Sequence, residues 1–248
     1  MGAGEPTGGG PVVPRHGGRQ VIPRPATAKA GAPAPWAELT AAARRGITVE
    51  RVVAALAGGE RGGPTSALRP ATLADPGRPA AVLAAVFEEV GEARVLLTRR
   101  AAHLRSHRGE VSFPGGRLEA AESAEAAARR EAAEEIGLDP AVVEPVGRLS
   151  PVTTFSSGST IVPVVAVLGG RPRLSPNPTE VEHAFDVSLA ELAEPAIFRE
   201  EWWTVPGRAP VEAAAGAFPV WFFELPDDTV WGATARMLVE LLRLVLAV

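Results

Sequence analysis

The sequence contains no cysteine. Disulfide bonds, thiolate metal sites and a cysteine nucleophile are therefore excluded. The absence of disulfides fits a reducing cytoplasm, which we expect as the location of the protein. Lysine is also scarce, since Lys29 is the sole lysine and the other basic residues are arginines. Together with abundant Ala, Gly and Pro, this bias makes each single arginine less informative than usual.

Long apolar runs that would span a membrane are also missing. The most apolar stretch, residues 230–248, is interrupted by Arg236, Glu240 and Arg243, so we expect a core-packing helix there. Residues 1–35 lack the continuous apolar core of a signal peptide. The net charge of −4 gives no general attraction to nucleic acid or to an anionic membrane. We therefore expect neither nucleic acid nor a membrane as a partner, and the sequence leaves open whether the protein is a homodimer.

The composition is that of a soluble globular protein, with 46% hydrophobic and 22% charged residues in 248 positions. Residues 1–35 are rich in Gly, Pro and Ala and are predicted to form a disordered tail. Residues 36–78 are predicted to form a helical extension followed by a linker. Residues 79–248 are predicted to form the main domain.

The local patterns predict both strands and helices. A helix over 36–56 has Gly46 as a break, and a second helix over 123–136 has Ser123 as N-cap and Gly137 as C-cap. Short apolar runs at 80–87 and 94–99 predict a β-hairpin. Further strands are expected at 110–113, 142–149, 161–168 and 220–225, and further helices at 189–193 and 230–247. This mixed order predicts an α+β fold or an α/β/α sandwich.

The helix over 123–136 carries three glutamates, Glu131, Glu134 and Glu135, at positions i, i+3 and i+4. They project from one helix face and repel each other unless a cation neutralises them. Oxygen-only ligands of this kind suit Mg²⁺ or Mn²⁺. Arg130 could pair with Glu122 or Glu134 and hold the helix to the preceding loop. The alternative is a solvated, salt-bridged surface helix, which is the more common origin of E-x-x-E-E alone.

The wider spacing favours the metal-binding interpretation. The residues at fixed separations are Gly116, Glu122, Arg130, Glu131, Glu134, Glu135, Gly137 and Leu138. They resemble the Nudix box, and Ala132 stands where that family usually has a larger aliphatic residue. The resemblance implies a mixed β-sheet sandwiched between α-helices. It also implies hydrolysis of a nucleoside diphosphate linked to another moiety, with Mg²⁺ or Mn²⁺ as cofactor.

The resemblance also implies roles for individual residues. Glu131 and Glu135 match the main metal ligands, Glu134 a further ligand or the general base, and Glu122 an orienting residue or outer ligand. Glu134, Glu131 and Arg130 form the predicted catalytic set. The cation neutralises charge on the phosphates and lowers the pKa of a bound water, whose proton a carboxylate accepts as the water attacks phosphorus.

A second resemblance narrows the substrate. The segment upstream of the box, LLTRRAAHLRSHRGEVSFPGGR, resembles the L-L-T-x-R…L-R-x-H-x-G-x-V-x-F-P-G-G pattern of the coenzyme A pyrophosphatase subfamily. The residues matched to it are Leu96, Leu97, Thr98, Arg99, Leu104, Arg105, His107, Gly109, Val111, Phe113, Pro114, Gly115 and Gly116. Residues 177–181 and 230–235 are weaker matches downstream. The substrate-binding residues predicted from this segment are Arg99, Arg105, His107, Gly115 and Gly116.

This segment is also basic. It carries six arginines, at 94, 99, 100, 105, 108 and 117, against the single Glu110. Guanidinium groups match phosphate oxygens, and CoA carries a 3′-phosphate besides its pyrophosphate. The alternative is that these arginines only solvate strand edges.

Four other residues have two interpretations each. His107 is a phosphate contact or a buried, hydrogen-bonded structural histidine, and the second is favoured. Glu180 is a base or ligand reaching in from a loop, or a solvated loop residue, and again the second is favoured. Trp202 and Trp203 line an acyl or pantetheine pocket, or are packing anchors.

Three functions follow from the sequence. The leading one is cation-dependent hydrolysis of CoA or a CoA derivative to 3′,5′-ADP and a 4′-phosphopantetheine product. The second is a Nudix pyrophosphatase for ADP-ribose, a dinucleoside polyphosphate or an oxidised nucleotide. The third is an inactive Nudix domain that senses a ligand or binds a protein, and the intact set of glutamates argues against it.

Overall fold

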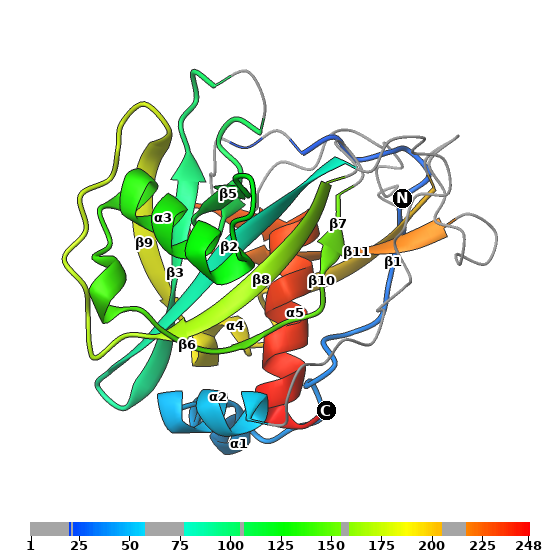
Figure 1. The fold of residues 1–248 in the computed structure, drawn as a ribbon. Helices are drawn as coiled ribbons and strands as arrows, with labels where there is room; N and C mark the ends of the chain where they lie inside the picture. The colour runs from blue at the N-terminus through cyan, green and yellow to red at the C-terminus, as the bar shows by residue number, and fades with distance from the viewer. Residues whose placement is uncertain (1–19, 21, 58–76, 105–106, 155–158, 205–216) are drawn as a thin grey trace, which may run out of the picture.

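A long β-hairpin, β2 (Gly77–Glu89) and β3 (Glu92–Arg100), lies at the centre of the main sheet (Figure 1). The structure is a computed structural model and describes residues 20, 22–57, 77–104, 107–154, 159–204 and 217–248. The predicted hairpin is confirmed, and both strands are longer than expected. The turn at its tip places Val90 and Gly91 at positive φ, 52° and 75°.

The main sheet is mixed and contains eight strands. Besides the hairpin they are β4 (Val111–Ser112), β5 (Gly115–Arg117), β6 (Glu144–Arg148), β7 (Val152–Thr153), β8 (Ser159–Val167) and β9 (Val181–Ser188). β8 runs parallel to β2, whereas β9 pairs antiparallel with β3. The predicted α+β fold is therefore confirmed.

A second, antiparallel sheet contains the remaining strands. They are β1 (Lys29–Ala30), β10 (Phe198–Thr204), β11 (Ala217–Glu224) and β12 (Thr229–Trp231). The described helices are α1 (Ala41–Arg45), α2 (Val49–Leu56), α3 (Ala124–Ile136), α4 (Leu189–Leu192) and α5 (Gly232–Leu246), with a 3₁₀ turn at Pro140–Val142. None of these described helices is long and apolar enough to cross a membrane.

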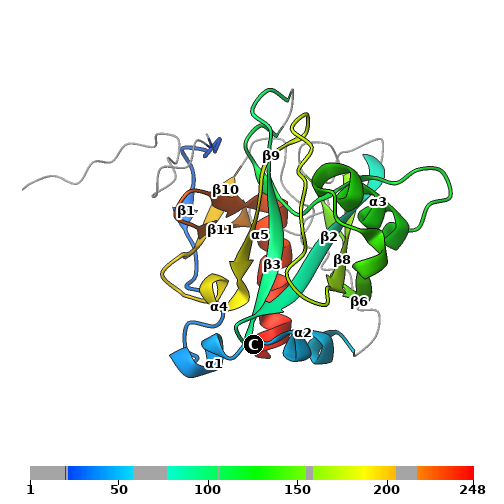
Figure 2. The same cartoon turned by 90° about the vertical axis from the view of Figure 1, so that its left-hand side faces the viewer.

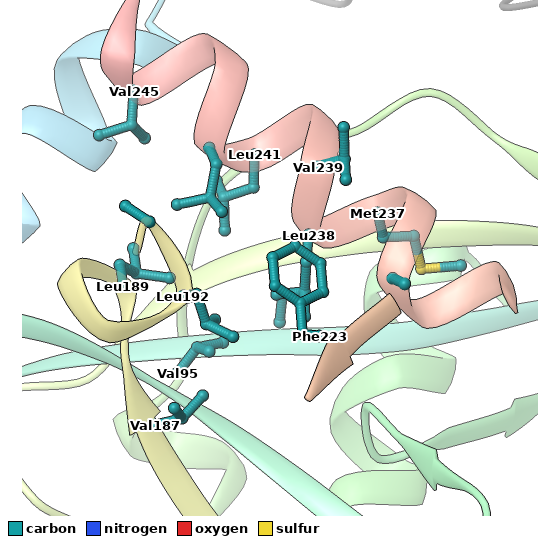
Figure 3. Close-up of a cluster of buried hydrophobic side chains, with 14 of the residues drawn as sticks. Val95, Val187, Leu189, Leu192, Phe223, Met237, Leu238, Val239, Leu241 and Val245 are labelled. Carbon is teal, nitrogen blue, oxygen red and sulfur yellow. The ribbon is translucent and has the colours of Figure 1, made fainter. Parts of the chain in front are cut away.

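The two faces of the main sheet are covered by different helices. Side chains alternate along a strand, so that Leu96 of β3 faces α3, whereas Val95 and Leu97 face α5. Figures 1 and 2 show α3 on one face of this sheet and α5 between it and the second sheet. Figure 3 shows Leu238 and Leu241 of α5 in the core between the sheets.

Residues 22–34 correct the prediction for the N-terminal region. The expected disordered tail over 1–35 is wrong for this part, because β1 pairs with β10 and Ile22 is fully buried. Arg24 donates a hydrogen bond of 2.7 Å to the buried carboxylate of Glu201. Composition missed this segment because its few apolar residues find a partner surface only in the folded domain. Residues 1–19 and 21 lie outside the described part of the chain.

The remaining local predictions divide into two groups. The helices over 123–136 and 189–193 are confirmed, and the one over 230–247 is confirmed from Gly232, because residues 230 and 231 belong to β12. The helix over 36–56 is confirmed in part, as α1 and α2 separated at Gly46, whereas residues 36–40 are not helical. The strands β9 and β10 were not predicted. Both carry charged residues at several positions, and their backbones are extended because neighbouring strands pair with them.

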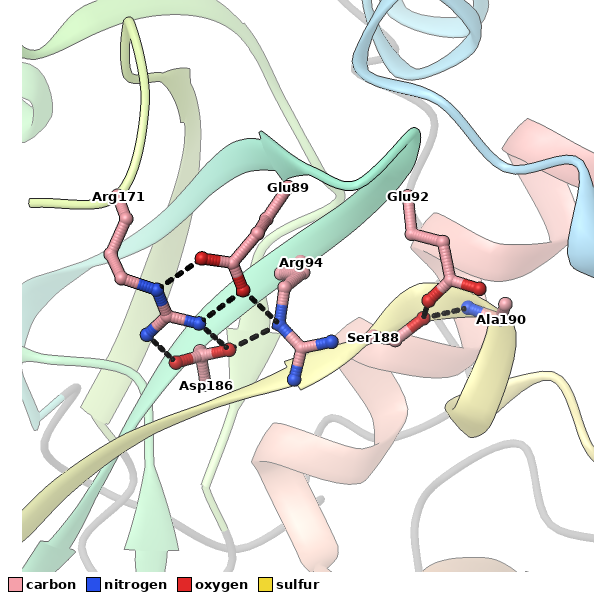
Figure 4. Close-up of polar contacts among 7 residues, drawn as sticks. All are labelled: Glu89, Glu92, Arg94, Arg171, Asp186, Ser188 and Ala190. Carbon is pink, nitrogen blue, oxygen red and sulfur yellow. Dashed lines mark hydrogen bonds and ion pairs between the residues drawn. The ribbon is translucent and has the colours of Figure 1, made fainter.

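A polar network fixes β9 against the hairpin. Arg171 forms ion pairs with Glu89 and Asp186 at 2.6 Å each, and Arg94 also binds Asp186 (Figure 4). Near the other end of the same surface, Ser188 donates a hydrogen bond of 2.8 Å to Glu92. The guanidinium of Arg94 is thus already bound to carboxylates of the fold, and we do not count it among the arginines that could bind a phosphate.

Candidate active site

Helix α3 carries the acidic residues of the site and lies against the main sheet. Its sheet-facing side is formed by Ala127, Ala128, Ala132 and Ile136, all fully buried. Small alanine side chains let the helix approach the strands closely, so the unusual Ala132 is a packing residue. Ser123 accepts a hydrogen bond of 3.1 Å from the N–H of Ala126, and the helix ends where Gly137 adopts a φ of 65°.

Glu135 is the most buried acidic residue of α3, with 3% of its surface exposed. Its carboxylate accepts a hydrogen bond of 3.1 Å from the N–H of Gly115 and lies 3.7 Å from the guanidinium of Arg100. Burial raises the pKa of Glu135 to about 7, and these two contacts only partly oppose that rise. A buried carboxylate with so little compensation is suited to bind a cation.

Glu131 lies one turn before Glu135 and contacts strand β5. A Cβ atom placed on Gly116 would lie 2.4 Å from the Glu131 carboxyl carbon, so any larger residue at 116 would displace this carboxylate. Burial raises the pKa of Glu131, and Arg130 opposes the rise. The two glycines of β5 thus have separate contacts, Gly115 with Glu135 and Gly116 with Glu131.

Arg130 connects the other glutamates. Its guanidinium lies 3.0 Å from Glu122, 2.9 Å from Glu131 and 3.1 Å from Glu134, and it also donates to the carbonyl of Arg117 at 3.0 Å. The sequence left open whether Arg130 pairs with Glu122 or Glu134, and the structure shows both pairs. Hydrogen bonding to Arg130 holds the pKa of Glu122 below its usual value.

The donor set fits a hard divalent cation at two of the four predicted ligands. Glu131 and Glu135 face β5 as a pair of partly or fully buried carboxylates. Arg130 binds Glu131 as well as Glu122 and Glu134, so each of these three would have to exchange or share that contact with a cation, whereas Glu135 has no contact with Arg130. Within the described residues, no three acidic or histidine side chains converge as ready-made ligands.

Glu180 approaches the same face from the residue before β9. Its negative charge raises the pKa of both Glu131 and Glu135, which places its carboxylate within electrostatic range of each. Its backbone carbonyl accepts a hydrogen bond of 2.8 Å from Ala101, next to Arg100. The favoured interpretation of Glu180 as a solvated loop residue agrees with its exposed side chain. It did not foresee that this loop lies close to Glu131 and Glu135.

Arg99 does not face this site. It forms a double hydrogen bond with the buried carboxylate of Asp228, at 2.8 and 2.6 Å, on the α5 side of the sheet. The predicted substrate contact is therefore wrong, because neighbouring residues of a strand point to opposite faces. Arg100 is the arginine that faces α3, and it is also the one that stands at the last position of L-L-T-x-R. The sequence signal was present but was matched one residue too early.

The other predicted substrate residues are dispersed. His107 is exposed and forms a contact of 2.8 Å with Glu110, which raises the pKa of its imidazole, so the preferred interpretation of a buried histidine is wrong. Arg108 and Arg117 are exposed. Arg105 lies outside the described residues. Of the two adjacent indoles, Trp203 is buried and bonded to Glu201, whereas Trp202 is 41% exposed.

Comparisons with known proteins agree with the geometry of α3. A family model described as the NUDIX domain matches residues 77–206. The chain is 37% identical over 169 residues to Nudix hydrolase 22, chloroplastic, of Arabidopsis thaliana, in a match that covers 65% of this chain and 53% of the plant protein. It is 34% identical over 173 residues to an uncharacterized Nudix hydrolase, NudL, of Photorhabdus laumondii, with coverage of 69% and 87%.

The chain thus spans about half the length of the plant relative. Among solved structures, a Nudix hydrolase from M. smegmatis, RenU, is similar with a TM-score of 0.42 and 25% identity, over 53% of this chain and 78% of that one.

Proposed function

Because the chain belongs to the Nudix family, we propose that it hydrolyses the pyrophosphate bond of a nucleoside diphosphate derivative with the help of Mg²⁺ or Mn²⁺. The observation that supports this proposal is the pair of glutamates on α3. Glu131 and Glu135 are held against the two glycines of β5, and Glu135 is buried without a full counter-charge. A divalent cation would compensate this charge and bring a diphosphate to the same place.

We further propose CoA or a CoA derivative as the substrate, with 3′,5′-ADP and a 4′-phosphopantetheine product. The support is the resemblance of residues 96–117 to the pattern of CoA pyrophosphatases, in which Arg100 stands at the arginine of L-L-T-x-R. In this fold Arg100 lies 3.7 Å from Glu135. Of the arginines of this segment that the structure describes, Arg100 thus lies beside the cluster, and the backbone carbonyl of the exposed Arg117 accepts a hydrogen bond from Arg130. Fewer of the described arginines therefore lie beside the glutamates than the six arginines of the sequence suggested.

The protein residues divide the work of the reaction among them. A bound cation supplies charge neutralisation for the phosphates and a water of lowered pKa. Gly115 orients the carboxylate of Glu135 through its N–H, and Arg130 fixes that of Glu131. Glu134 and Glu180 are the two candidates for accepting the proton of the attacking water. The Glu134 carboxylate accepts a hydrogen bond from Arg130, which it would have to give up in order to accept the proton. No described residue forms a hydrogen bond or ion pair with the Glu180 carboxylate.

Two other functions remain as alternatives. Another nucleoside diphosphate, such as ADP-ribose or a dinucleoside polyphosphate, would use the same glutamates with different contacts to the rest of the substrate. An inactive, ligand-sensing domain is the second alternative, and the ion pairs of Arg130 with three glutamates would suit it, because they satisfy these charges without a cation. The cytoplasmic location and the absence of a nucleic-acid partner stay predictions.

The test is a hydrolysis assay with product identification. CoA, ADP-ribose and a dinucleoside tetraphosphate are each incubated with the protein, with Mg²⁺, with Mn²⁺ and with a chelator. We expect release of 3′,5′-ADP from CoA that depends on the cation and is abolished in Glu135→Gln. Activity on ADP-ribose alone would overturn the CoA assignment, and inactivity on all three would favour the sensing domain. The single variants Glu134→Gln and Glu180→Gln identify the general base. The rate of hydrolysis rises with pH as the base loses its proton, and only the variant that lacks the base should lose this rise.

A further inference from the structure

A groove lies at the edge of the main sheet, away from the glutamates of α3. It has a volume of about 680 Å³ and is formed by β9, the first turn of α4 and the turn that connects β11 to β12. Side chains from both faces of β9 line it, since Asp186 lies opposite Leu96 on the α3 side of the sheet, whereas Phe185 and Val187 belong to the α5 side. Glu182 stands at a register shift between β9 and β3 and lies 3.7 Å from Arg99. The groove therefore follows the edge of the strand.

This edge is open among the described residues. β9 pairs with β3 along Val181–Ser188, and no described strand pairs with its other side. Every second residue of such an edge presents a backbone N–H and C=O without a strand partner. Edges of this kind bind extended peptides by adding a strand, with backbone hydrogen bonds for affinity and pockets for alternate side chains. The half-buried Phe185 provides apolar surface in the groove, and Val187 and Leu225 line it as core residues that are 3% and 5% exposed.

The groove is also acidic. Five carboxylates line it, and Arg99 and His183 are the basic residues beside them. Three of them are engaged, since Asp228 binds Arg99, Asp186 binds Arg94 and Arg171, and Glu182 lies 3.7 Å from Arg99. Glu191 and Asp227 form no ion pair or side-chain hydrogen bond with any part of the chain that the structure describes. Their charge is left for a ligand.

We propose that this groove binds an extended, basic segment of another protein, which adds a strand to the open edge of β9. The edge selects an extended backbone, the exposed part of Phe185 selects an aliphatic side chain, and Glu191 and Asp227 select Arg or Lys. A second copy of this chain fits less well, because two β9 edges would bring Glu182 and Asp186 of each copy together. The inference is independent of the reaction on α3, because the groove shares no lining residue with the glutamate cluster.

The probe is a labelled octapeptide that alternates Arg and Val, with both ends blocked. Binding to the full chain is followed by fluorescence anisotropy at 150 mM salt, and amide hydrogen exchange locates the contact. We expect saturable binding and slower exchange in β9. A peptide methylated at alternate backbone nitrogens is expected to bind at least about tenfold more weakly, because it cannot complete the strand ladder. A Glu-Val peptide is expected not to bind.

Two double variants, one in the groove and one outside it, each remove two negative charges. The double variant Glu191→Gln, Asp227→Asn is expected to weaken binding by about threefold to tenfold, as for two exposed ion pairs. The control Glu38→Gln, Glu144→Gln changes the net charge equally at exposed positions outside the groove and is expected to bind as the original protein does.

Several outcomes would overturn the proposal. Equal binding of the methylated peptide, or equal loss in both double variants, would mean nonspecific attraction. Slow exchange of β9 in the free protein at high dilution would mean that another part of the same chain covers the edge. Slow exchange that appears only at high protein concentration would assign the edge to a second copy.

Discussion

The N–H of Gly115 donates a hydrogen bond of 3.1 Å to the carboxylate of Glu135, across twenty positions of sequence. This contact joins the strand that precedes the acidic helix to the last glutamate of that helix. It orients a carboxylate that is 3% exposed, and among the described residues no other backbone N–H donates to this side chain.

Glu135 is expected to make the stability of the metal-free protein depend on pH. Its pKa rises from 4.5 to about 7 on folding, so the folded state holds the proton more tightly than the unfolded state. The stability that the protonated Glu135 contributes to the folded state is therefore fully present below pH 4.5 and is lost as pH rises through 7. The free energy of unfolding falls by about 3 kcal/mol in total. Glu135→Gln removes this loss.

The measurement is urea unfolding in a chelator at pH 4.5 and at pH 8. We expect the variant and the original protein to be about equally stable at the lower pH and the variant to be more stable at the higher pH. Identical profiles of the two proteins would show that the Glu135 carboxylate is ionised as easily in the fold as in water.

The two glycines of β5 are expected to respond differently to the same added methyl group. In Gly115→Ala the Cβ would lie 2.3 Å from the carbonyl oxygen of Ala81, and backbone cannot yield cheaply, so we expect a loss of about 2–4 kcal/mol in unfolding free energy. In Gly116→Ala the Cβ meets the carboxylate of Glu131, which can rotate away. Stability should then change by less than about 1 kcal/mol while hydrolysis falls at least about tenfold.

Thermal unfolding and the hydrolysis assay together check this contrast. Gly169→Ala is the control, because a Cβ there meets no atom within 4 Å. Normal activity in a folded Gly116→Ala protein would show that Glu131 has no role in the reaction.

Substitution of Arg99 is expected to lower stability, whereas substitution of Arg100 is expected to lower activity. Arg99→Met leaves the buried Asp228 without its partner and should lower the free energy of unfolding by about 3 kcal/mol, with the KM for substrate unchanged. Arg100→Met removes the cation beside Glu135 and should lower kcat/KM at least about tenfold. Asp228→Asn should reproduce the stability loss of Arg99→Met. A higher KM in Arg99→Met at unchanged stability would restore the substrate contact expected from the sequence.

Ile22 is expected to behave as a core residue. It is fully buried against the second sheet, in a cluster with Trp203 and Phe222. Ile22→Ala should therefore cost about 2–4 kcal/mol, measured by urea unfolding. Val142→Ala, at a position that is 48% exposed, is the control and should cost less than about 0.5 kcal/mol. Equal effects of the two substitutions would mean that residues 22–34 dissociate readily from the domain.

Local patterns predicted the elements that local interactions stabilise. Ser123 and Gly137 bound α3 because a cap depends on a few neighbouring residues, and the hairpin follows from two apolar runs around a turn. β9 and β10 could not be predicted in this way, since their extended form depends on pairing with distant strands. The identity of the glutamate cluster came from its spacing in a single helix, which fixes the face on which its members project.

The sequence by itself determined that Glu131, Glu134 and Glu135 share a helix face, because 3.6 residues per turn leave no other arrangement. Only the tertiary structure decided how they differ. It buries Glu135 against Gly115, exposes Glu134 and gives Arg130 to three carboxylates at once. It likewise turned Arg99 towards Asp228 and Arg100 towards Glu135. Burial and partner choice are properties of surfaces that meet only after folding, and no spacing along the chain encodes them.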